Sequence, residues 1–328
     1  MKLVAVNEKL IGHVLATPIY TEKGIMFLNK GNEINDKAII RLKKMGINTM
    51  YIEDGNDEIS LQEVLPTPIK IQCIQSLVEI FNETQAKQYV DDKKVIEIVK
   101  NIINDVNLSE NAVLISNIAP NSELSKLAMH CIDVTILAII IGIKKKFNDS
   151  KLMNLGIASL LHDIGKLFSD SHEHVKIGYE LVKKNIVFAA TTYMAIYYLY
   201  EREDGSGPFG VCGEKLHEFV KILSICNEYI TIISGEKRIL PHEAIEKITA
   251  MAITKFDKEI FKDFIESIYC YPNGLNVKLN NDLLGIVVMQ NKGVTTRPII
   301  GAYKNDSYCF CNLLDKSNLT LFIKEVVL

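Results

Sequence analysis

The chain has 328 residues, enough for two or three folding units, and its hydrophobic content of 48% is sufficient for a packed core. Its formal net charge of −3 gives no overall attraction to DNA, RNA or an anionic membrane, so an anionic ligand must be held by a local pocket. The 7 cysteines show no paired rhythm, which favours reduced thiols in a cytoplasmic protein over disulfides. The most apolar run, residues 134–143, is shorter than the roughly 20 residues that span a bilayer. We therefore predict a buried core helix there and no membrane span.

Residues 1–60 are predicted to form a small α/β module. Two short strands flank a turn at residues 22–24, because β-branched and aromatic residues surround a glycine there. Apolar residues at helical spacing predict a helix over residues 36–47, and a strand-like run follows at residues 48–54. Nothing in this module has the residue types of a catalytic site.

Residues 61–268 are predicted to be helical, with Pro66 and Pro68 near the boundary. We divide this part into a helical linker, residues 61–110, and a helical domain, residues 111–268. Exposed faces of the linker at residues 69–105 could pair two chains into a homodimer. Amphipathic runs predict helices at residues 71–82, 94–105, 124–146, 152–167, 174–184, 189–202, 215–233 and 242–254.

Residues 269–328 change character and are predicted to form a short β-rich extension. A Pro-Asn-Gly turn at residues 272–274 precedes strand-like runs at residues 276–279 and 285–289. The predicted fold class is mainly α, with a helical bundle between a small α/β N-terminal module and a β-rich C-terminal extension.

The string LLHDIGK, residues 160–166, places a histidine and an aspartate side by side late in an apolar helix. On a helix, His162 and Asp163 point about 100° apart, so both reach one metal ion only at the helix edge. A buried carboxylate is costly unless a cation neutralises it. Gly165 allows close approach of backbone or ligand, and Lys166 supplies a positive charge suited to phosphate. A lone His-Asp pair is more often a helix-end pair than a ligand pair, but the longer string is more specific.

Two further histidines lie on either side of this pair in the sequence. His130 begins the run HCIDVTILA one long helix upstream, and His174 begins HVKIGYELVKK shortly downstream. Taken singly, each is more often a surface or core histidine than a ligand. Together with His162 and Asp163 they favour a metal site, because imidazole and carboxylate suit Zn, Fe or Mn.

The segment YEREDGSGPFG, residues 200–210, contains a turn that can expose backbone amides to an anion. Gly205 and Gly207 belong to this turn, and Arg202 lies just before it. Without the histidines upstream, the segment would be interpreted as an ordinary surface loop.

In this combination the residues resemble the HD-GYP family, a bacterial branch of the HD phosphohydrolases. The strings LLHDIGK, HVKIGYELV, ER·DGSG·P and KFDKEIFKDFI match the family in order and spacing, and the resemblance covers roughly residues 110–265. It extends weakly to the N-terminal module and to the C-terminal extension. The resemblance implies an HD-type helical domain that hydrolyses cyclic di-GMP with two or three metal ions.

The metal site implied by this resemblance is incomplete. The family has a histidine pair where this chain has Leu199 and Tyr200, and an aspartate where it has Asn227; the tyrosine before the proline is also missing. One ion would be held by His130, His162, Asp163 and Asn227. The other would keep only Asp163 and His174, because leucine cannot ligate a metal and neutral tyrosine is a poor ligand. We expect one divalent metal, Fe, Mn, Zn or Ni, and an empty second site.

The candidate catalytic residues are Asp163 and Lys166, and a phosphate would be surrounded by Lys166, Arg202, Gly205 and Gly207. Losing one strong transition-state donor typically costs ~10²–10³ in rate, and losing a metal should cost at least as much. We therefore predict a degenerate signalling protein that binds cyclic di-GMP, a related nucleotide or a partner protein, with little or no hydrolysis. The alternative is a working phosphodiesterase, or another nucleotide phosphohydrolase, with a mononuclear metal site.

Overall fold

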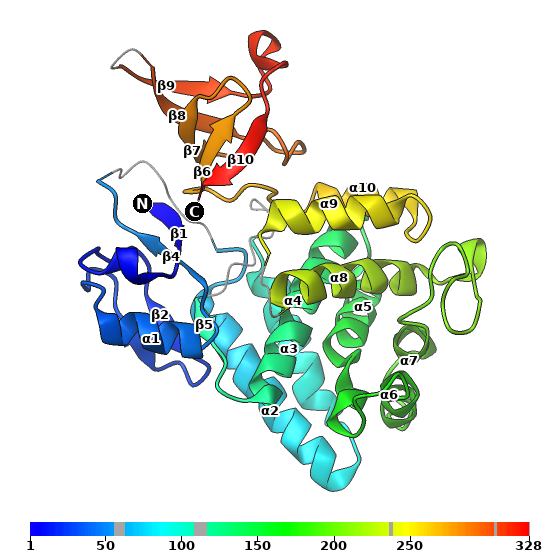
Figure 1. Cartoon of the computed structure of the whole chain (residues 1–328). Coiled ribbons are helices and arrows are strands. Elements are labelled where there is room, and N and C mark those ends of the chain that lie inside the picture. The colour runs from blue at the N-terminus through cyan, green and yellow to red at the C-terminus, as the bar shows by residue number, and fades with distance from the viewer. Residues whose placement is uncertain (56–62, 108–116, 236–238, 305–306, 328) are drawn as a thin grey trace. The chain divides into compact units, whose positions relative to one another are not determined.

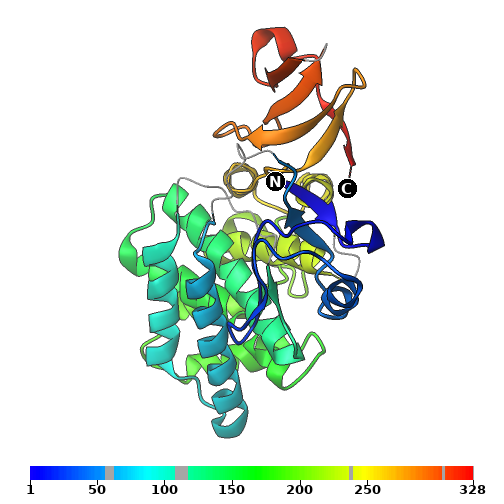
Figure 2. The ribbon, with the colours of Figure 1, turned by 90° about the vertical axis from the view of Figure 1, so that its left-hand side faces the viewer.

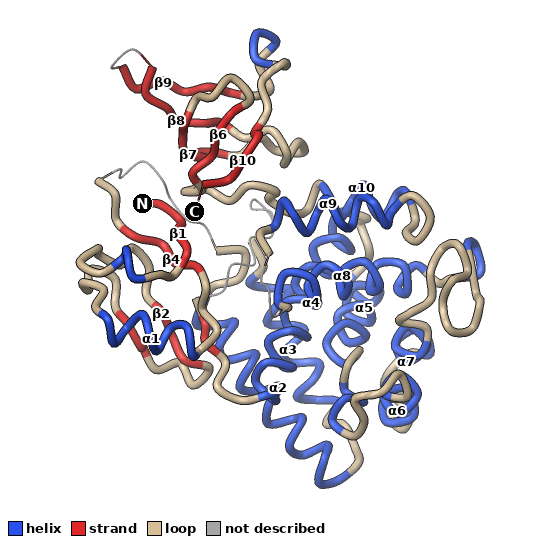
Figure 3. Tube along the Cα trace, viewed as in Figure 1, coloured by secondary structure: helices blue, strands red, loops and turns tan. Residues whose placement is uncertain are grey.

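The computed structural model describes residues 1–55, 63–107, 117–235, 239–304 and 307–327. The chain divides into two compact units. The first unit combines Met1–Gln62, Val113–Asn121 and Ile268–Leu328, and the second combines Glu63–Ala112 and Ser122–Ser267. Strands are concentrated in the first unit and helices in the second (Figure 1, Figure 3). The predicted fold class, mainly α with a small α/β module and a β-rich C-terminal region, is confirmed.

The N-terminal part of the first unit contains two small sheets and one helix. Its strands are β1 (Lys2–Ala5), β2 (Ile19–Thr21), β3 (Met26–Leu28), β4 (Thr49–Ile52) and β5 (Ile118–Ala119). Strand β1 pairs with β4, and β2 lies between β3 and β5. Helix α1 (Asp36–Lys44) begins where the Asn35 side chain accepts a hydrogen bond from the Ala38 amide. Ile39 and Leu42 of α1 are buried in the local core, so the predicted strand–helix–strand order is confirmed.

The C-terminal part of the first unit is one five-stranded antiparallel sheet in the order β10-β6-β7-β8-β9. Its strands are β6 (Asn276–Leu279), β7 (Leu284–Met289), β8 (Ile299–Lys304), β9 (Ser307–Asn312) and β10 (Ile323–Val327). The turn before β6 is bonded to the N-terminal strand, because the Leu3 amide donates to the Gly274 carbonyl at 2.8 Å. Gly274 has φ +84°, and a Cβ there would lie 3.1 Å from the Tyr51 ring, so this contact requires glycine.

The second unit is a helical bundle around α4. Its α-helices are α2 (Thr67–Lys87), α3 (Asp92–Asp105), α4 (Glu123–Lys144), α5 (Asp149–Leu161), α6 (His174–Lys183), α7 (Ala190–Tyr197), α8 (Glu218–Ser234), α9 (Pro241–Ala252) and α10 (Lys258–Ile265). Helix α4 packs against α2, α5 and α8. The cyan helices α2 and α3 run alongside the green helices of the bundle (Figure 2). The predicted linker helices therefore belong to the same compact unit as the helical domain.

Helix α4 contains the most apolar run of the sequence. Among the described residues it is the one helix whose length and hydropathy would allow it to cross a membrane, and 72% of its apolar window is buried inside the protein. Residues Val134 and Leu137 have no exposed surface. This burial confirms the predicted core helix, because a helix that is apolar on all sides and covered by other helices is typical of a protein core.

Two predicted helices end earlier than expected. The run predicted over residues 152–167 is α5 followed by a separate 3₁₀ turn, η2 (Ile164–Leu167), and the run predicted over residues 189–202 ends as α7 at Tyr197. Asp163 has φ −105° and ψ 10°, and Tyr198 has φ −95° and ψ 17°, so both leave the α-helical region. In both places the chain turns into a segment that carries candidate site residues.

Candidate metal centre

The His-Asp pair lies where α5 ends and η2 begins. His162 keeps helical angles, with φ −57° and ψ −32°, whereas Asp163 does not. The backbone change lets both side chains face one buried point: His162 Nε2 lies 3.3 Å from Asp163 Oδ2, and neither side chain is exposed. The expectation that the two side chains diverge by about 100° on a continuous helix is wrong, because the helix ends at this pair.

Gly165 brings η2 against α6. A Cβ on this residue would lie 1.9 Å from the His174 carbonyl oxygen and 2.8 Å from the Gly178 amide nitrogen. Only glycine allows this approach. The close packing explains how His174, at the first position of α6, reaches Asp163 on η2: its Nε2 lies 3.4 Å from Asp163 Oδ1.

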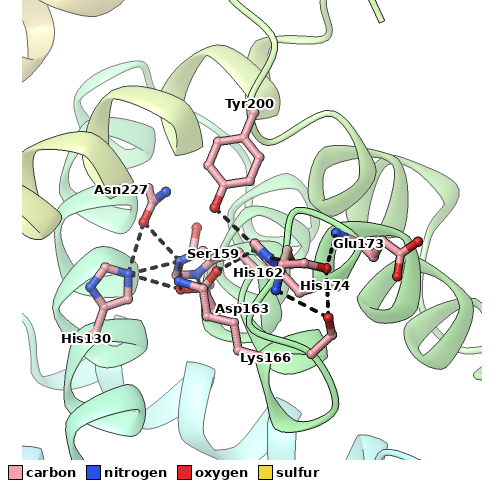
Figure 4. Close-up of polar contacts among 11 residues, drawn as sticks. His130, Ser159, His162, Asp163, Lys166, Glu173, His174, Tyr200 and Asn227 are labelled. Atoms are coloured by element: carbon pink, nitrogen blue, oxygen red, sulfur yellow. Dashed lines mark hydrogen bonds and ion pairs between the residues drawn. The ribbon is translucent and has the colours of Figure 1, made fainter. Parts of the chain in front are cut away.

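Two further helices bring His130 and Asn227 to the His-Asp pair. His130 lies on α4 and Asn227 on α8, and His130 Nε2 is 3.0 Å from Asn227 Oδ1. His162 Nε2 is 3.2 Å from both His130 Nε2 and Asn227 Oδ1. Figure 4 shows these atoms converging on one side of Asp163. The four residues predicted to hold the first ion are therefore assembled from α4, the α5–η2 junction and α8.

The hydrogen bond of the second ring nitrogen orients each buried imidazole. His162 Nδ1 donates to the Ser159 carbonyl at 2.7 Å, and His174 Nδ1 donates to the Ser171 carbonyl at 2.8 Å. In the neutral rings this leaves Nε2 as the atom with the lone pair. Each acceptor is a backbone carbonyl three residues upstream, so the sequence contained no side-chain signal for it.

Burial and charge decide where protons reside in this cluster. Burial lowers the pKa of His130 to about 4, so this imidazole is neutral at pH 7. Burial also disfavours charge on His162, but the adjacent Asp163 carboxylate outweighs it and raises the pKa of His162 to about 10. Burial disfavours ionisation of Asp163 as well, yet the His162 imidazolium holds the pKa of this carboxyl well below its ordinary value. Without a metal, a proton on His162 therefore neutralises the cluster.

The residues present fit a divalent metal ion. The ligand atoms of His130, His162 and Asp163 lie within 4.8 Å of one another. Asp163 Oδ2 faces His130 and His162, and Oδ1, which faces His174, is buried without a hydrogen bond in the part of the chain that the structure describes, whereas such oxygens are normally paired. Imidazole nitrogens with carboxylate and amide oxygens are a ligand set for Fe, Mn, Zn or Ni. This group could hold a metal, which would take the place of the His162 proton.

The other side of Asp163 has a different composition. The Tyr200 hydroxyl donates to His174 Nε2 at 3.2 Å (Figure 4). The Tyr200 ring stands edge-on to the His174 ring, at 5.7 Å between centroids and 88° between planes. Leu199, at the other expected ligand position, is completely buried. The two positions at which the resemblance predicts histidines are therefore a phenol that contacts His174 and a buried hydrocarbon.

The candidate phosphate-binding residues differ in how far they are already engaged. Lys166 Nζ lies 2.6 Å from Asp163 Oδ2, and its side chain is 34% exposed. Arg202 lies next to the centre, but its Nη2 is 3.0 Å from Glu228 Oε2 and its Nη1 bonds two backbone carbonyls. The Gly205 amide donates to the Arg202 carbonyl at 3.0 Å. Lys166 is thus the candidate cation in direct contact with the candidate metal ligands.

Glu201 holds the loop that contains Gly205 and Gly207 through hydrogen bonds to backbone amides. Its buried carboxylate accepts hydrogen bonds from the Phe209 amide at 2.7 Å and the Val211 amide at 2.6 Å. A Cβ on Gly207 would lie 2.5 Å from Glu201 Cα, so the loop folds tightly over this residue. The sequence pattern identified Glu201 as part of the frame, and the structure adds its partners, which are backbone amides.

Comparison with known proteins agrees with this geometry. The HD domain family model matches residues 127–231, a segment that contains every candidate metal ligand. A cyclic di-GMP phosphodiesterase of Pseudomonas aeruginosa is 26% identical over 285 residues, which cover 80% of this chain and 69% of that protein. An HDG"Y"P protein of Bdellovibrio bacteriovorus has a similar fold, with a TM-score of 0.50 and 19% identity over 80% of this chain and 98% of that structure. The chain therefore contains an HD domain, and its predicted resemblance to the HD-GYP proteins is confirmed.

Proposed function

We propose that this protein is a degenerate HD-GYP-type module of cyclic di-GMP signalling, which binds a nucleotide or a partner protein and hydrolyses the nucleotide slowly or not at all. The observation that carries the proposal is the hydrogen bond from the Tyr200 hydroxyl to His174 Nε2 at 3.2 Å. It engages the lone pair that His174 would offer to a second ion. Leu199 beside it has no ligand atom, so only Asp163 and His174 remain for that ion.

We propose that a single divalent metal binds between His130, His162, Asp163 and Asn227. When bound, a metal at this position would polarise a phosphate oxygen and acidify a water molecule. A second cation beside Asp163 would have to displace the Tyr200 hydroxyl. The Lys166 ammonium lies 2.6 Å from Asp163 Oδ2, the oxygen that faces His130 and His162, so a metal bound there would share this oxygen with the ammonium.

The proposed ligand class is a cyclic dinucleotide, of which cyclic di-GMP is the first to test. The supporting observations are the Pseudomonas relative, which is named a cyclic di-GMP phosphodiesterase, and the partly exposed Lys166 ammonium at the centre. An ammonium next to a metal can hold a phosphate as a point charge. Arg202, Gly205 and Gly207 stay predicted phosphate contacts, which a ligand would engage by exchanging their present hydrogen bonds. We place this activity in the bacterial cytoplasm.

The second candidate function is a working phosphohydrolase with one metal. It is favoured by the intact convergence of His130, His162 and Asp163 within 4.8 Å, because a purely structural role gives no reason to bury a carboxylate among imidazoles. In this case Lys166 would replace part of the charge that a second metal supplies, and Asp163 and Lys166 would be catalytic.

The deciding experiment measures metal content, nucleotide binding and turnover on the same preparation. Protein purified without chelator is analysed for metal by mass spectrometry, titrated with cyclic di-GMP by calorimetry, and assayed for hydrolysis with added Mn²⁺ or Fe²⁺. We expect one metal per chain, binding of the nucleotide and no turnover. Turnover that disappears in Asp163→Asn would reject the degenerate function in favour of the mononuclear enzyme.

Variants that supply histidines at positions 199 and 200 test the same proposal through metal content. Tyr200→His, alone and with Leu199→His, should raise the metal content above that of the wild type, because each change returns an imidazole ligand. Tyr200→Phe is the matched control, since it removes the hydroxyl without supplying a ligand. A wild-type protein that already holds two metals would contradict the proposal.

A further inference from the structure

Helix α6 has one face that the helical bundle leaves uncovered. The helix lies at the edge of the second unit (Figure 1). The residues of this face follow helical spacing: Glu173, Lys176, Ile177, Glu180, Leu181 and Lys184. With Gln88 and Phe168 they line an open groove of ≈ 460 Å³. The face is about 16 Å long, at 1.5 Å per residue, which is the length of a helix–helix contact.

The charges on this face alternate in sign along the helix. Glu173, Lys176, Glu180 and Lys184 are all exposed, and within the described ranges none of them forms an ion pair at 4 Å or less. Pairs at i, i+4 would be available within α6, for example Lys176 with Glu180. Lys184 donates to the Gln88 carbonyl at 3.1 Å, while the other three groups are exposed at the groove, where another chain could reach them.

Apolar residues accompany these charges. Ile177, which is partly buried, occupies the middle of the face, and Leu181 beneath it is 5% exposed. Phe168 at the groove is 39% exposed. Immediately after α6, Ile186 is 98% exposed and Val187 is 61% exposed. Exposed hydrophobic side chains at and just after a charged helix face are typical of a protein–protein contact.

We propose that a second copy of this chain docks on this face, with its own α6 antiparallel to the first across a twofold axis. In this register Glu173 of one copy meets Lys184 of the other, and Lys176 meets Glu180. The axis makes each contact occur twice, and the partly buried Ile177 of each copy lies near the centre. A parallel pair would oppose like charges, which is destabilising, whereas the antiparallel pair opposes only unlike ones.

The charge pattern identifies the occupant as another copy, because a sequence whose signs reverse from end to end is complementary to itself. Antiparallel α6 helices also bring opposite ends of the helix dipoles together. Helix α6 begins at His174, so the dimer contact would be made by the same helix that presents this imidazole to Asp163. The inference does not depend on nucleotide binding or metal content.

Sedimentation equilibrium of the full chain, between about 1 and about 200 μM, tests the proposal through a cycle of charge reversals. We expect a reversible wild-type dimer. Lys176→Glu and Glu180→Lys should each weaken it by about 10-fold or more, because each opposes like charges twice. The double variant should restore the dimer to within about 3-fold of the wild type, because the unlike contacts return with reversed sign.

Matched controls come from α9, where Glu246 and Lys247 are exposed. Glu246→Lys and Lys247→Glu make the same charge changes away from α6 and should leave the dimer unchanged. Ile186→Asp should weaken the dimer. The Ile186 side chain is 98% exposed, so the substitution should leave folding unchanged. A wild type that stays monomeric throughout, single reversals without effect, or a double variant no better than the singles would each overturn the proposal.

Discussion

The two halves of the candidate metal centre share Asp163 but differ in what surrounds it. On the α4–α8 side, two imidazole Nε2 atoms, of His130 and His162, and the Asn227 Oδ1 atom converge at one point, at 3.0 to 3.2 Å from one another. On the α6–α7 side, His174 is hydrogen-bonded to Tyr200. In the first half, Asp163 Oδ2 faces His130 and His162 and contacts the Lys166 ammonium at 2.6 Å. In the second half, the Tyr200 hydroxyl engages His174, and Asp163 Oδ1 has no hydrogen bond among the described residues. The two halves therefore differ in composition: one gathers two imidazoles and an amide, and the other pairs one imidazole with a phenol.

The largest change in metal affinity should come from substituting Asp163, which both halves share. Asp163→Asn keeps the side-chain volume but removes the charge, so metal affinity should fall by about 10³-fold, as expected when one partner of a buried charge cluster is lost. Competition with a fluorescent chelator measures this affinity. Asp170→Asn is the matched control at an exposed position, and an equal loss there would show that the effect is not local.

His130 and His174 separate the two halves. His130→Ala should reduce metal affinity by about 10²-fold, because it removes one ligand from the converging set, while His174→Ala should change it much less. The same chelator competition compares the two variants directly. Equal losses would mean that the metal bridges both halves, and the proposed single site would be wrong.

The pH dependence of metal binding should reflect the His162 proton. Its pKa is raised to about 10, so between pH 6 and 9 a metal must displace this proton, and its apparent affinity should rise about 10-fold per pH unit. His130, with a pKa of about 4, is already neutral and adds nothing in this range. Calorimetry in buffers of different ionisation enthalpy should detect one proton released per metal bound; no release would place the proton elsewhere.

In the metal-free protein the same raised pKa of His162 stabilises the fold, and this stabilisation decreases as the pH rises. The contribution of His162 is complete below its ordinary pKa of about 6.5 and is lost as the pH rises toward 10. Chemical denaturation of the metal-free chain at pH 7 and pH 9 should therefore give a lower free energy of unfolding at pH 9. His162→Gln, which cannot bind the proton, should remove most of that difference.

The smallest effect, a change in the free energy of unfolding, should come from removing the Tyr200–His174 hydrogen bond of the second half. Tyr200→Phe removes only the hydroxyl that donates to His174, so the free energy of unfolding should fall by about 1 kcal/mol, measured by chemical denaturation. Tyr193→Phe, on α7, removes a hydroxyl for which no hydrogen bond is found among the described residues, and its effect should be close to zero. If the two substitutions lower the free energy of unfolding equally, the Tyr200–His174 hydrogen bond does not stabilise the protein.

Residue types and their order were enough to predict the mainly α fold and the candidate ligands. The string LLHDIGK, two outlying histidines and the Glu-Arg-Asp-Gly segment are local patterns, and the family resemblance that they indicate is confirmed. The prediction was wrong at the His-Asp pair itself, where a continuous helix was expected. A helix end at Asp163 depends on the packing of Gly165 against α6, which is a contact between segments separated in the sequence.

The sequence by itself determined which chemistry this centre can support, because ligand identity is a property of residue type: imidazoles, a carboxylate and an amide are present, and leucine and tyrosine stand at two positions where the resemblance predicts histidines. Only the tertiary structure decided how those residues are used. The Tyr200 hydroxyl on His174, the approach of His174 to Asp163 and the contact of His130 with Asn227 join segments that are far apart in the chain. Such contacts depend on distances across the bundle, which no spacing along one segment encodes.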